Sequence, residues 1–195
     1  MKRVGLYFGS FNPVHTGHIH LAKYLTDNNL VDEVWFVISP CNPLKDQAGL
    51  IDEYQRLDML MLAIKDNPRF KVCDIEFTMP IPSYTVDTLA ELHKQFADIQ
   101  FTLLIGSDNA LVFDKWKSPD LILANYPVLV YPRKGYDFEV VAEKYPQMQL
   151  LNSPFFEISS TQIREDIAQK KDVTQWLHPS VYQFIQELDL YKNGL

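Results

Sequence analysis

The sequence predicts an α/β protein with a Rossmann-like open parallel sheet and helices on both of its faces. Four short apolar runs, 4–8, 34–38, 101–105 and 128–131, are each bounded by Gly, Pro, Ser or Asn. None of them alternates polar with apolar residues, which is typical of parallel strands that are buried on both faces. Segments with the apolar spacing of amphipathic helices lie between them, and this alternation of strand and helix predicts the fold class.

The helices are predicted from apolar residues that recur every three or four positions and therefore share one helical face. Two further strands are expected, one within 70–77 and one that ends at 157–159. The segment 135–154 shows no clear periodicity, so no element is predicted there. The residues that define the helical faces are Ile19, Ala22 and Leu25; Leu57, Met61 and Ile64; Val86, Leu89 and Phe96; and Val181, Phe184, Ile185 and Leu188.

The chain has 195 residues, 47% of them hydrophobic and 22% charged, which is ordinary for one globular domain. No internal repeat or linker divides it, so we expect a single domain over 1–195, with a smaller helical C-terminal part from about residue 161. No apolar run approaches the roughly 20 residues of a membrane span, and the first residues do not match a signal peptide. Cys41 and Cys73 show no motif spacing and are expected to be reduced, which favours the cytoplasm. Since no apolar run is long enough to span a bilayer, no membrane attachment is expected.

The net charge of −7 argues against nucleic acid as a partner, because nucleic-acid binding requires a basic surface. The same charge would repel an anionic small molecule, so such a ligand would need a local cluster of cations. Ligands of open α/β sheets bind beyond the carboxyl ends of the strands. In this chain those places are 9–18, 39–45, 106–109, 132–135 and 158–164, and they include the cations Lys45, Arg133, Lys134 and Arg164.

The stretch "GSFNPVHTGH", residues 9–18, joins the first predicted strand to the first helix. Unpaired backbone N–H groups and the positive end of the helix dipole make such a helix start an anion site. His15 and His18 are three residues apart and face the same side, so both imidazoles are placed to donate to a phosphate chain. A metal site is the weaker interpretation, because no Cys or acidic cluster lies at ligand spacing. His20 points elsewhere on the helix and is interpreted as structural.

The stretch "ISSTQIR", residues 158–164, repeats this arrangement late in the chain. Ser159, Ser160 or Thr161 is predicted to cap a helix whose N-terminus also suits phosphate. Arg164 follows about one turn later, where its guanidinium is able to bind phosphate oxygens bidentately. The alternative is an ordinary N-cap followed by a surface arginine. No P-loop and no G-x-G-x-x-G motif occurs in the sequence, so any phosphate site uses a different loop.

Two further stretches hold aromatic residues at loop–helix junctions. In "PSYTVDTL" Ser83 or Thr85 is expected to cap a helix that follows Tyr84, and in "DNALVFDKW" Trp116 follows a short helical segment. Such aromatic residues usually belong to the core, but they also suit stacking on a planar ring. Asp108, in "GSD", is a candidate either for a ribose hydroxyl or for a helix cap.

Together these motifs resemble the nucleotidyltransferase superfamily whose signature is an (H/T)-x-G-H loop and a late I-S-x-T-x-x-R segment. Within it the chain is similar to the bacterial nicotinate-nucleotide (nicotinic acid mononucleotide) adenylyltransferases. The narrower matches are "PSYTVDTL", "IGSDNALVFDKW", "YPRKGY" and "HPSVYQFIQELDLY", which lie in the family's order over nearly the whole length.

The resemblance implies that ATP and nicotinate mononucleotide give nicotinate adenine dinucleotide and pyrophosphate in NAD biosynthesis. It implies that His15, His18 and Arg164 are catalytic residues on the phosphates of ATP, and that Mg²⁺ is bound with ATP. A homo-oligomer is left open. The implied ATP-binding residues are Gly9, Ser10, Phe11, His15, His18, Gly106, Asp108, Ser159, Ser160, Thr161 and Arg164; the implied substrate-binding residues are Lys45, Tyr84, Thr85, Trp116 and Arg133.

One departure concerns the loop "NPLKD", residues 42–46, where many relatives carry a Pro-Pro-His-Lys sequence. Leu44 takes the place of that histidine, so Lys45 is expected to serve the substrate phosphate instead. The alternatives are adenylyl transfer to phosphopantetheine or flavin mononucleotide, and a non-catalytic nucleotide sensor on the same fold. The two histidines, Arg164 and the "PSYT" stretch favour the pyridine-nucleotide enzyme over these.

Overall fold

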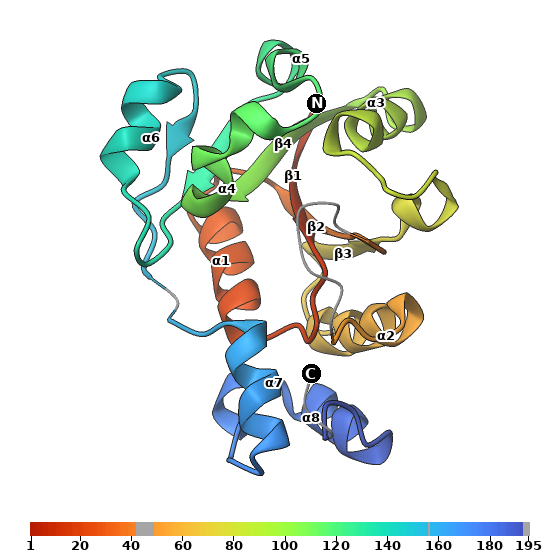
Figure 1. Cartoon of the computed structure of the whole chain (residues 1–195). Helices are drawn as coiled ribbons and strands as arrows, with labels where there is room; N and C mark the ends of the chain where they lie inside the picture. Colours follow the sequence, from red (N-terminus) through yellow and green to blue (C-terminus); the bar gives the residue numbers. More distant parts are fainter. Residues whose placement is uncertain (42–48, 156, 193–195) are drawn as a thin grey trace.

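The computed structural model describes residues 1–41, 49–155 and 157–192. Its centre is a six-stranded parallel sheet in the order β3-β2-β1-β4-β5-β6 (Figure 1). All neighbouring strands pair in parallel, which confirms the predicted Rossmann-like class. The strands are β1 (Lys2–Gly9), β2 (Glu33–Ile38), β3 (Phe70–Cys73), β4 (Ile99–Gly106), β5 (Val128–Tyr131) and β6 (Gln149–Leu150).

The strand order reverses between β1 and β4, the two central strands. The chain builds outward from β1 to β3 on one side and from β4 to β6 on the other. Gly9 pairs with Ile38 of β2, and Tyr7 pairs with Leu104 of β4, so these strands end at one edge. A crevice is expected where the order reverses at the carboxyl ends, and this places the loops after β1 and β4 opposite each other.

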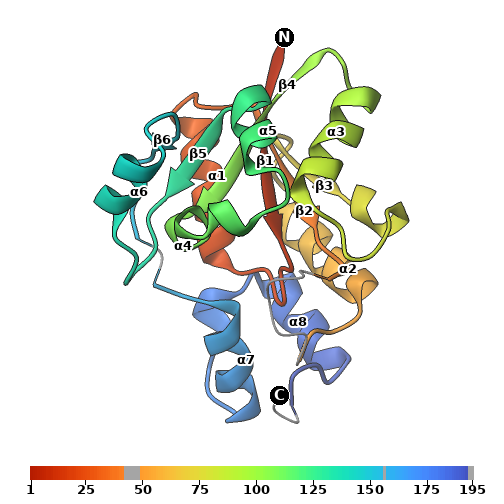
Figure 2. The ribbon, with the colours of Figure 1, turned by 45° about the horizontal axis from the view of Figure 1, so that its top comes forward.

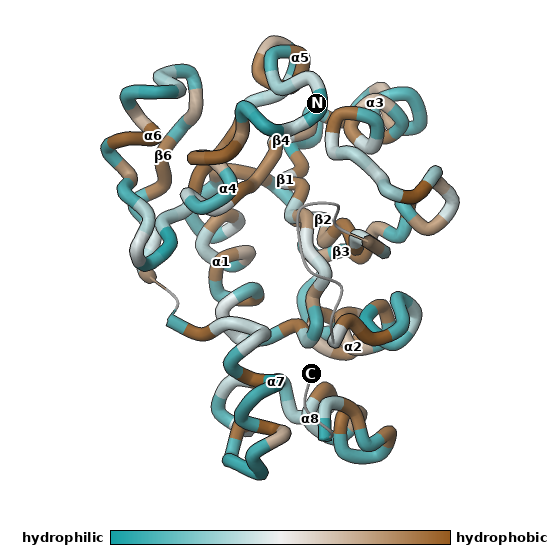
Figure 3. Tube along the Cα trace, viewed as in Figure 1, coloured by the Kyte–Doolittle hydropathy of each residue, from teal (hydrophilic) through white to brown (hydrophobic). Residues whose placement is uncertain are grey.

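Helices cover both faces of the sheet (Figure 2). Alternate residues of β1 face opposite sides: Leu6 packs with Leu89 of α3, whereas Tyr7 belongs to the core that includes Leu21 of α1. In Figure 3 the strands carry much of the apolar colour, as expected for strands buried on both faces. The helices are α1 (Thr16–Asp27), α2 (Glu53–Ile64), α3 (Thr85–Gln95), α4 (Ser107–Leu111), α5 (Pro119–Asn125), α6 (Phe138–Lys144), α7 (Ser160–Ala168) and α8 (Pro179–Glu187).

Helices α7 and α8 form the helical C-terminal part, which lies beside α1 and α2 (Figure 1). Val181 and Ile185 of α8 are fully buried, in the same core as Leu60 of α2. None of the helices that the structure describes is both long and apolar enough to cross a bilayer.

Two strand predictions need correction. The strand expected to end at 157–159 is absent, because Ser159 caps α7 and this stretch serves as the helix entry. The sixth strand is instead Gln149–Leu150, inside the segment for which no element was predicted. The strand expected within 70–77 ends at Cys73 and is followed by a 3₁₀ helix over Ile75–Thr78.

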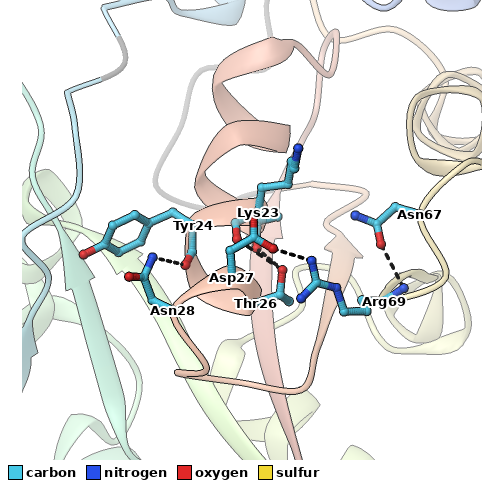
Figure 4. Close-up of polar contacts among 8 residues, drawn as sticks. Lys23, Tyr24, Thr26, Asp27, Asn28, Asn67 and Arg69 are labelled. Atoms are coloured by element: carbon cyan, nitrogen blue, oxygen red, sulfur yellow. Dashed lines mark hydrogen bonds and ion pairs between the residues drawn. The ribbon is translucent and has the colours of Figure 1, made fainter.

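An ion pair connects the C-terminal end of α1 to the residue before β3, at the edge of the sheet where the strands begin. The guanidinium of Arg69 pairs with the carboxylate of Asp27, and the Arg69 backbone N–H donates to Asn67 Oδ1 at 3.0 Å (Figure 4). The Asn28 amide donates to the Tyr24 carbonyl at 2.8 Å. These contacts fix the far end of α1, whose N-terminus lies at the carboxyl edge.

Candidate active site

His15 and His18 lie against each other at the start of α1. His15 is the N-cap residue, and its backbone N–H donates to Nδ1 of His18 at 3.2 Å. The two rings stack with centroids 3.7 Å apart, and the ring of Phe11 packs edge-on against His18 at 5.1 Å. The expected placement of both imidazoles on one side of the helix start is therefore correct in geometry.

His15 is only 6% exposed, and this burial decides its charge. Burial and, as the smaller cause, the nearby charge of Arg133 together lower the pKa of His15 from 6.5 to about 3. At neutral pH His15 is therefore uncharged, so toward an anion it is able to serve only as a hydrogen-bond donor and not as a cation.

Gly17 allows the segment before α7 to approach this histidine pair. A Cβ at position 17 would lie 3.0 Å from the His15 ring and 3.1 Å from Cγ2 of Ile158. Both distances are shorter than ordinary van der Waals contacts, so any side chain at this position would push the two segments apart.

Two hydrogen bonds connect the segment 158–164 to residues 9–18, which we call the histidine loop. Ser160 Oγ donates to the Pro13 carbonyl at 2.9 Å, and Arg164 Nη1 donates to the Asn12 carbonyl at 2.9 Å. Arg164 is half-buried, so the alternative of a surface arginine is wrong. Ser159 is the cap of α7 and accepts from the backbone N–H of Gln162 at 3.1 Å, as one of the three predicted candidates. The exposed Thr161 accepts a weaker bond, at 3.4 Å, from Arg164 Nη2.

Asp108 and Arg133 meet at the ends of β4 and β5. The Asp108 carboxylate lies 3.5 Å from Arg133 Nε, and the Arg133 backbone N–H donates to Ser107 Oγ at 2.9 Å. Gly106 lies beneath them, and a Cβ there would lie 2.3 Å from the Asp108 carboxylate, so a side chain at this position would displace that carboxylate. Asp108 does not cap α4, whose N-cap residue is Gly106. The helix-cap alternative for Asp108 is therefore wrong.

A cavity of about 270 Å³ opens beside these loops, between the ends of β1 and β4 and the start of α3. Tyr84, Thr85 and Trp116 all line it, so the structure brings together three residues that the sequence placed on one ligand. Lys115 and Lys117 also line the cavity, and sequence reasoning missed both. The cavity combines aromatic surface with cations, which suits a planar ring that carries negative charge.

Lys117 and Glu76 hold Tyr84 and its turn in place. Lys117 Nζ lies 4.9 Å from the centroid of the Tyr84 ring and 2.7 Å from the carboxylate of Asp87. Glu76 is buried and accepts hydrogen bonds from Ser83 Oγ at 2.6 Å and from Thr88 Oγ1 at 2.8 Å. Neither Ser83 nor Thr85 caps α3, since Ser83 is committed to Glu76 and the N-cap residue is Tyr84.

Arg56 of α2, like Glu76, is a buried charged residue that the sequence did not predict. It is fully buried, and its guanidinium donates to the carbonyls of Ile51, Ser10, Ser39 and Pro40 at 2.8 to 3.1 Å. It therefore links the loops after β1 and β2. A C=O and the following N–H point in opposite directions across a trans peptide, so the bond to the Ser10 carbonyl directs the Phe11 N–H away from Arg56.

Several other residues singled out in the sequence lie away from the positions expected for them or outside the described residues. The Phe11 side chain is 2% exposed and packs in the core, which leaves only its backbone for a ligand. The exposed Lys134 pairs with Glu157 at 3.2 Å rather than joining the cation cluster. His20 is exposed and, together with His15 and His178, lines another, largely apolar cavity of about 200 Å³. Lys45 and Leu44 lie outside the described residues.

The parallel sheet, the paired histidines at a helix start and the half-buried Arg164 beside them define a nucleotidyltransferase. In agreement, the model of the cytidylyltransferase-like family matches residues 6–166. Curated relatives then narrow the class. The chain is 46% identical to "Probable nicotinate-nucleotide adenylyltransferase" of Bacteroides fragilis, over 96% of this chain and 93% of that protein. It is 42% identical to the protein of the same name from Flavobacterium psychrophilum, over 97% and 99%. The chain belongs to the nicotinate-nucleotide adenylyltransferase family.

Solved structures agree on the fold. Nicotinic acid mononucleotide adenylyltransferase of Plasmodium falciparum, complexed with NaAD, superimposes with a TM-score of 0.85 at 22% identity. The superposition covers 100% of this chain and 99% of that one. The same Plasmodium protein complexed with APC gives a TM-score of 0.83.

Proposed function

We propose that this protein transfers the adenylyl group of ATP to nicotinate mononucleotide, producing nicotinate adenine dinucleotide and pyrophosphate for NAD biosynthesis. The observation that carries the proposal is the junction of the histidine loop with α7, next to the cavity lined by Tyr84 and Trp116. One side of this site suits a triphosphate and the other a pyridine ring. We place the reaction in the cytoplasm, with small-molecule substrates and no nucleic acid or membrane as partner.

The triphosphate would lie between the N-termini of α1 and α7. The neutral His15 and the neighbouring His18 would donate hydrogen bonds to it, and Arg164 would supply charge. The backbone of Gly9, Ser10 and Phe11 would line the nucleotide. The remaining contacts would come from the loop after β4 and the start of α7, through Gly106, Asp108, Ser159, Ser160 and Thr161.

The nicotinate mononucleotide would enter the cavity at the start of α3. Tyr84 and Trp116 would hold the pyridine ring, and Thr85 would contribute its backbone at the first turn of α3. Arg133, beside Asp108, and Lys45 would offset the charge of the substrate phosphate. The aromatic side chains would thus contact the ring of the substrate, and the cations would contact its phosphate.

The chemical step exchanges one bond to phosphorus for another. A 5′-phosphate oxygen of nicotinate mononucleotide bonds to the α-phosphorus of ATP as the bond from that phosphorus to the bridging oxygen breaks, and pyrophosphate leaves with the electron pair. The attacking phosphate is already an anion at neutral pH, so no general base is needed. Catalysis then consists of positioning and of stabilising the charge on the α-phosphate and pyrophosphate.

Mg²⁺ would be held mainly by ATP itself. No three His, Cys, Asp or Glu side chains that could form a metal site come together in the described ranges, whereas His15, His18 and Arg164 suit phosphate oxygens. Mg²⁺ prefers phosphate and water oxygens and often uses few protein ligands. When bound, it would neutralise charge on the leaving pyrophosphate.

One incubation tests the proposal. The protein is mixed with ATP and Mg²⁺ and, in turn, with nicotinate mononucleotide, nicotinamide mononucleotide or phosphopantetheine, and pyrophosphate release is measured. We expect release with nicotinate mononucleotide and at most a lower rate with its amide. Absence of release with either pyridine nucleotide would overturn the proposal, and release with phosphopantetheine alone would favour that enzyme.

A further inference from the structure

The last turn of the described chain reaches back to the histidine loop. Tyr191 follows α8, and its hydroxyl donates to Oδ1 of Asn12 at 2.7 Å, although 179 positions separate the two residues. Both residues lie in stretches quoted above, Asn12 in "GSFNPVHTGH" and Tyr191 at the end of "HPSVYQFIQELDLY", but neither was given a role there. Tyr191 thus connects the segment after α8 to this loop.

Asn12 is the point where three separate segments are joined. Its side chain is 4% exposed, and its Nδ2 donates to the Gly49 carbonyl at 2.8 Å while its Oδ1 accepts from Tyr191. Its carbonyl accepts from Nη1 of Arg164 at 2.9 Å. Asn12 therefore connects Tyr191, through its side chain, to Arg164, through its backbone carbonyl.

The fold holds Tyr191 firmly in this position. Leu190 is buried in the core, and its backbone N–H donates to the Ile185 carbonyl at 3.0 Å. Tyr191 has a left-handed backbone with φ of 63°, which costs free energy for a residue other than glycine. A partly buried hydrogen bond that is kept on a strained backbone is expected to serve more than local packing.

The surroundings of the hydroxyl keep it a donor. Burial raises the pKa of Tyr191, and the charges of Arg164 and Arg56 act in the opposite direction without offsetting it. The phenol therefore stays protonated at physiological pH. Asn12 Oδ1 has a constant partner under the conditions in which the enzyme would work.

We propose that Tyr191 is a positioning residue for adenylyl transfer, acting through Asn12 on Arg164 and the histidine loop. The inference rests on the proposed function, since Arg164 and the histidines are assigned there to the triphosphate. Tyr191 itself touches no substrate in this proposal. Its loss would misplace the groups on the ATP side and leave the pyridine cavity, lined by Tyr84 and Trp116, unchanged.

The test is Tyr191→Phe, which removes the hydroxyl and keeps the ring. We expect kcat/KM for ATP to fall about tenfold, the effect of one lost hydrogen bond of ordinary strength, while KM for nicotinate mononucleotide changes less than twofold. Tyr182→Phe is the matched control, because Tyr182 lies on α8 against the same core, and no hydrogen bond to the loop is found for it among described residues. It should retain wild-type kinetics.

A double-mutant cycle with Asn12→Ala separates positioning from general stability. If Tyr191 acts through Asn12, adding Tyr191→Phe to Asn12→Ala causes no further loss of kcat/KM. An additive double mutant, about a hundredfold below wild type, would contradict the proposal, as would a Tyr191→Phe enzyme with the kinetics of Tyr182→Phe.

The outcomes also separate this proposal from the function on which it rests. A wild-type protein that releases no pyrophosphate from ATP and pyridine nucleotide overturns the proposed function itself. A wild-type protein that is active, with Tyr191→Phe equally active, overturns only the role of Tyr191. Kinetics are measured well below the unfolding temperature of each variant, so that a purely structural loss does not register as a change in kcat/KM.

Discussion

The imidazole rings of His15 and His18 stack with their centroids 3.7 Å apart and their planes at 26°. Nδ1 of His18 accepts the His15 backbone N–H, so a neutral His18 carries its ring proton on Nε2. The stack therefore orients Nε2–H of His18 as a donor while His15 stays uncharged beside it. Two hydrogen-bond donors in fixed positions suit a phosphate group on which charge develops in a transition state.

His18→Ala should lower kcat at least about 100-fold, comparable to the loss of one donor that stabilises a transition state. His18→Gln should retain part of the rate, because its amide is able to place an N–H near the position of Nε2. Steady-state pyrophosphate release measures both, with His20→Ala as the control on the exposed side of α1. If His18→Ala ran at full speed, His18 would have no part in catalysis.

Stability should depend on pH through His15. Its pKa is about 3 when folded and 6.5 when unfolded, so below pH 6.5 the unfolded chain binds a proton that the folded chain does not. The free energy of unfolding should therefore fall as the pH falls from about 6.5 towards 3, by at most about 5 kcal/mol from this residue. Urea unfolding at a series of pH values measures the slope.

His15→Asn isolates this contribution, because asparagine does not titrate. The variant should show a shallower loss of stability between pH 6.5 and 4 than the wild type, whereas exchange of the exposed His93 for Asn should preserve the wild-type slope. Parallel curves for wild type and His15→Asn would mean that His15 is not held neutral in the folded protein.

Trp116 should act on the pyridine substrate through its ring. We expect Trp116→Ala to raise KM for nicotinate mononucleotide about tenfold with little change in kcat, since stacking contributes up to about 1.5 kcal/mol beyond area burial. Trp116→Phe keeps an aromatic surface and should have a smaller effect. Trp116 also packs against the buried Phe113 at 5.0 Å, so an unchanged KM would assign it to the core alone.

The sequence could predict the parts of this fold that repeat a local pattern. The runs at 4–8 and 101–105 are strands because short apolar runs can be buried on both faces, and the rule for strand ends correctly places "GSFNPVHTGH" after β1 at the carboxyl edge. The same rule placed "ISSTQIR" there through a strand that is absent, and hydrogen bonds to the Asn12 and Pro13 carbonyls hold that segment instead. Strand β6 (Gln149–Leu150) was missed because two residues show no periodicity, and its pairing with β5 is a tertiary effect.

Buried polar residues were missed for a different reason. Glu76, Arg56, Asn12 and Tyr191 look in the sequence like ordinary surface residues, because their partners are backbone carbonyls or hydroxyls on other segments. Only the three-dimensional structure shows that the Asn12 side chain meets Tyr191, or that Arg56 gathers carbonyls from two loops. One signal was available: Arg56 lies next to the apolar helical face that begins at Leu57.

Arg56 should be the most sensitive of these residues in its effect on stability. Arg56→Met would remove the donor of four carbonyls, and the free energy of unfolding should fall by about 3–5 kcal/mol, because hydrogen bonds to a charged group contribute about 1.5–3 kcal/mol each and do not add fully. Arg69→Met is the matched control, since the half-exposed pair of Arg69 with Asp27 should contribute less than about 1 kcal/mol. Urea unfolding at pH 7.5 compares the two.

Arg56→Lys distinguishes the shape of the guanidinium from its charge. A lysine keeps the cation but has only three donors on one nitrogen, so it cannot reach the Ile51, Ser10, Ser39 and Pro40 carbonyls together. We expect an intermediate loss of stability and a raised KM for ATP, because the Ser10 peptide sets the direction of the Phe11 N–H. Equal stability of Arg56→Lys and wild type would show that charge alone holds the loops after β1 and β2.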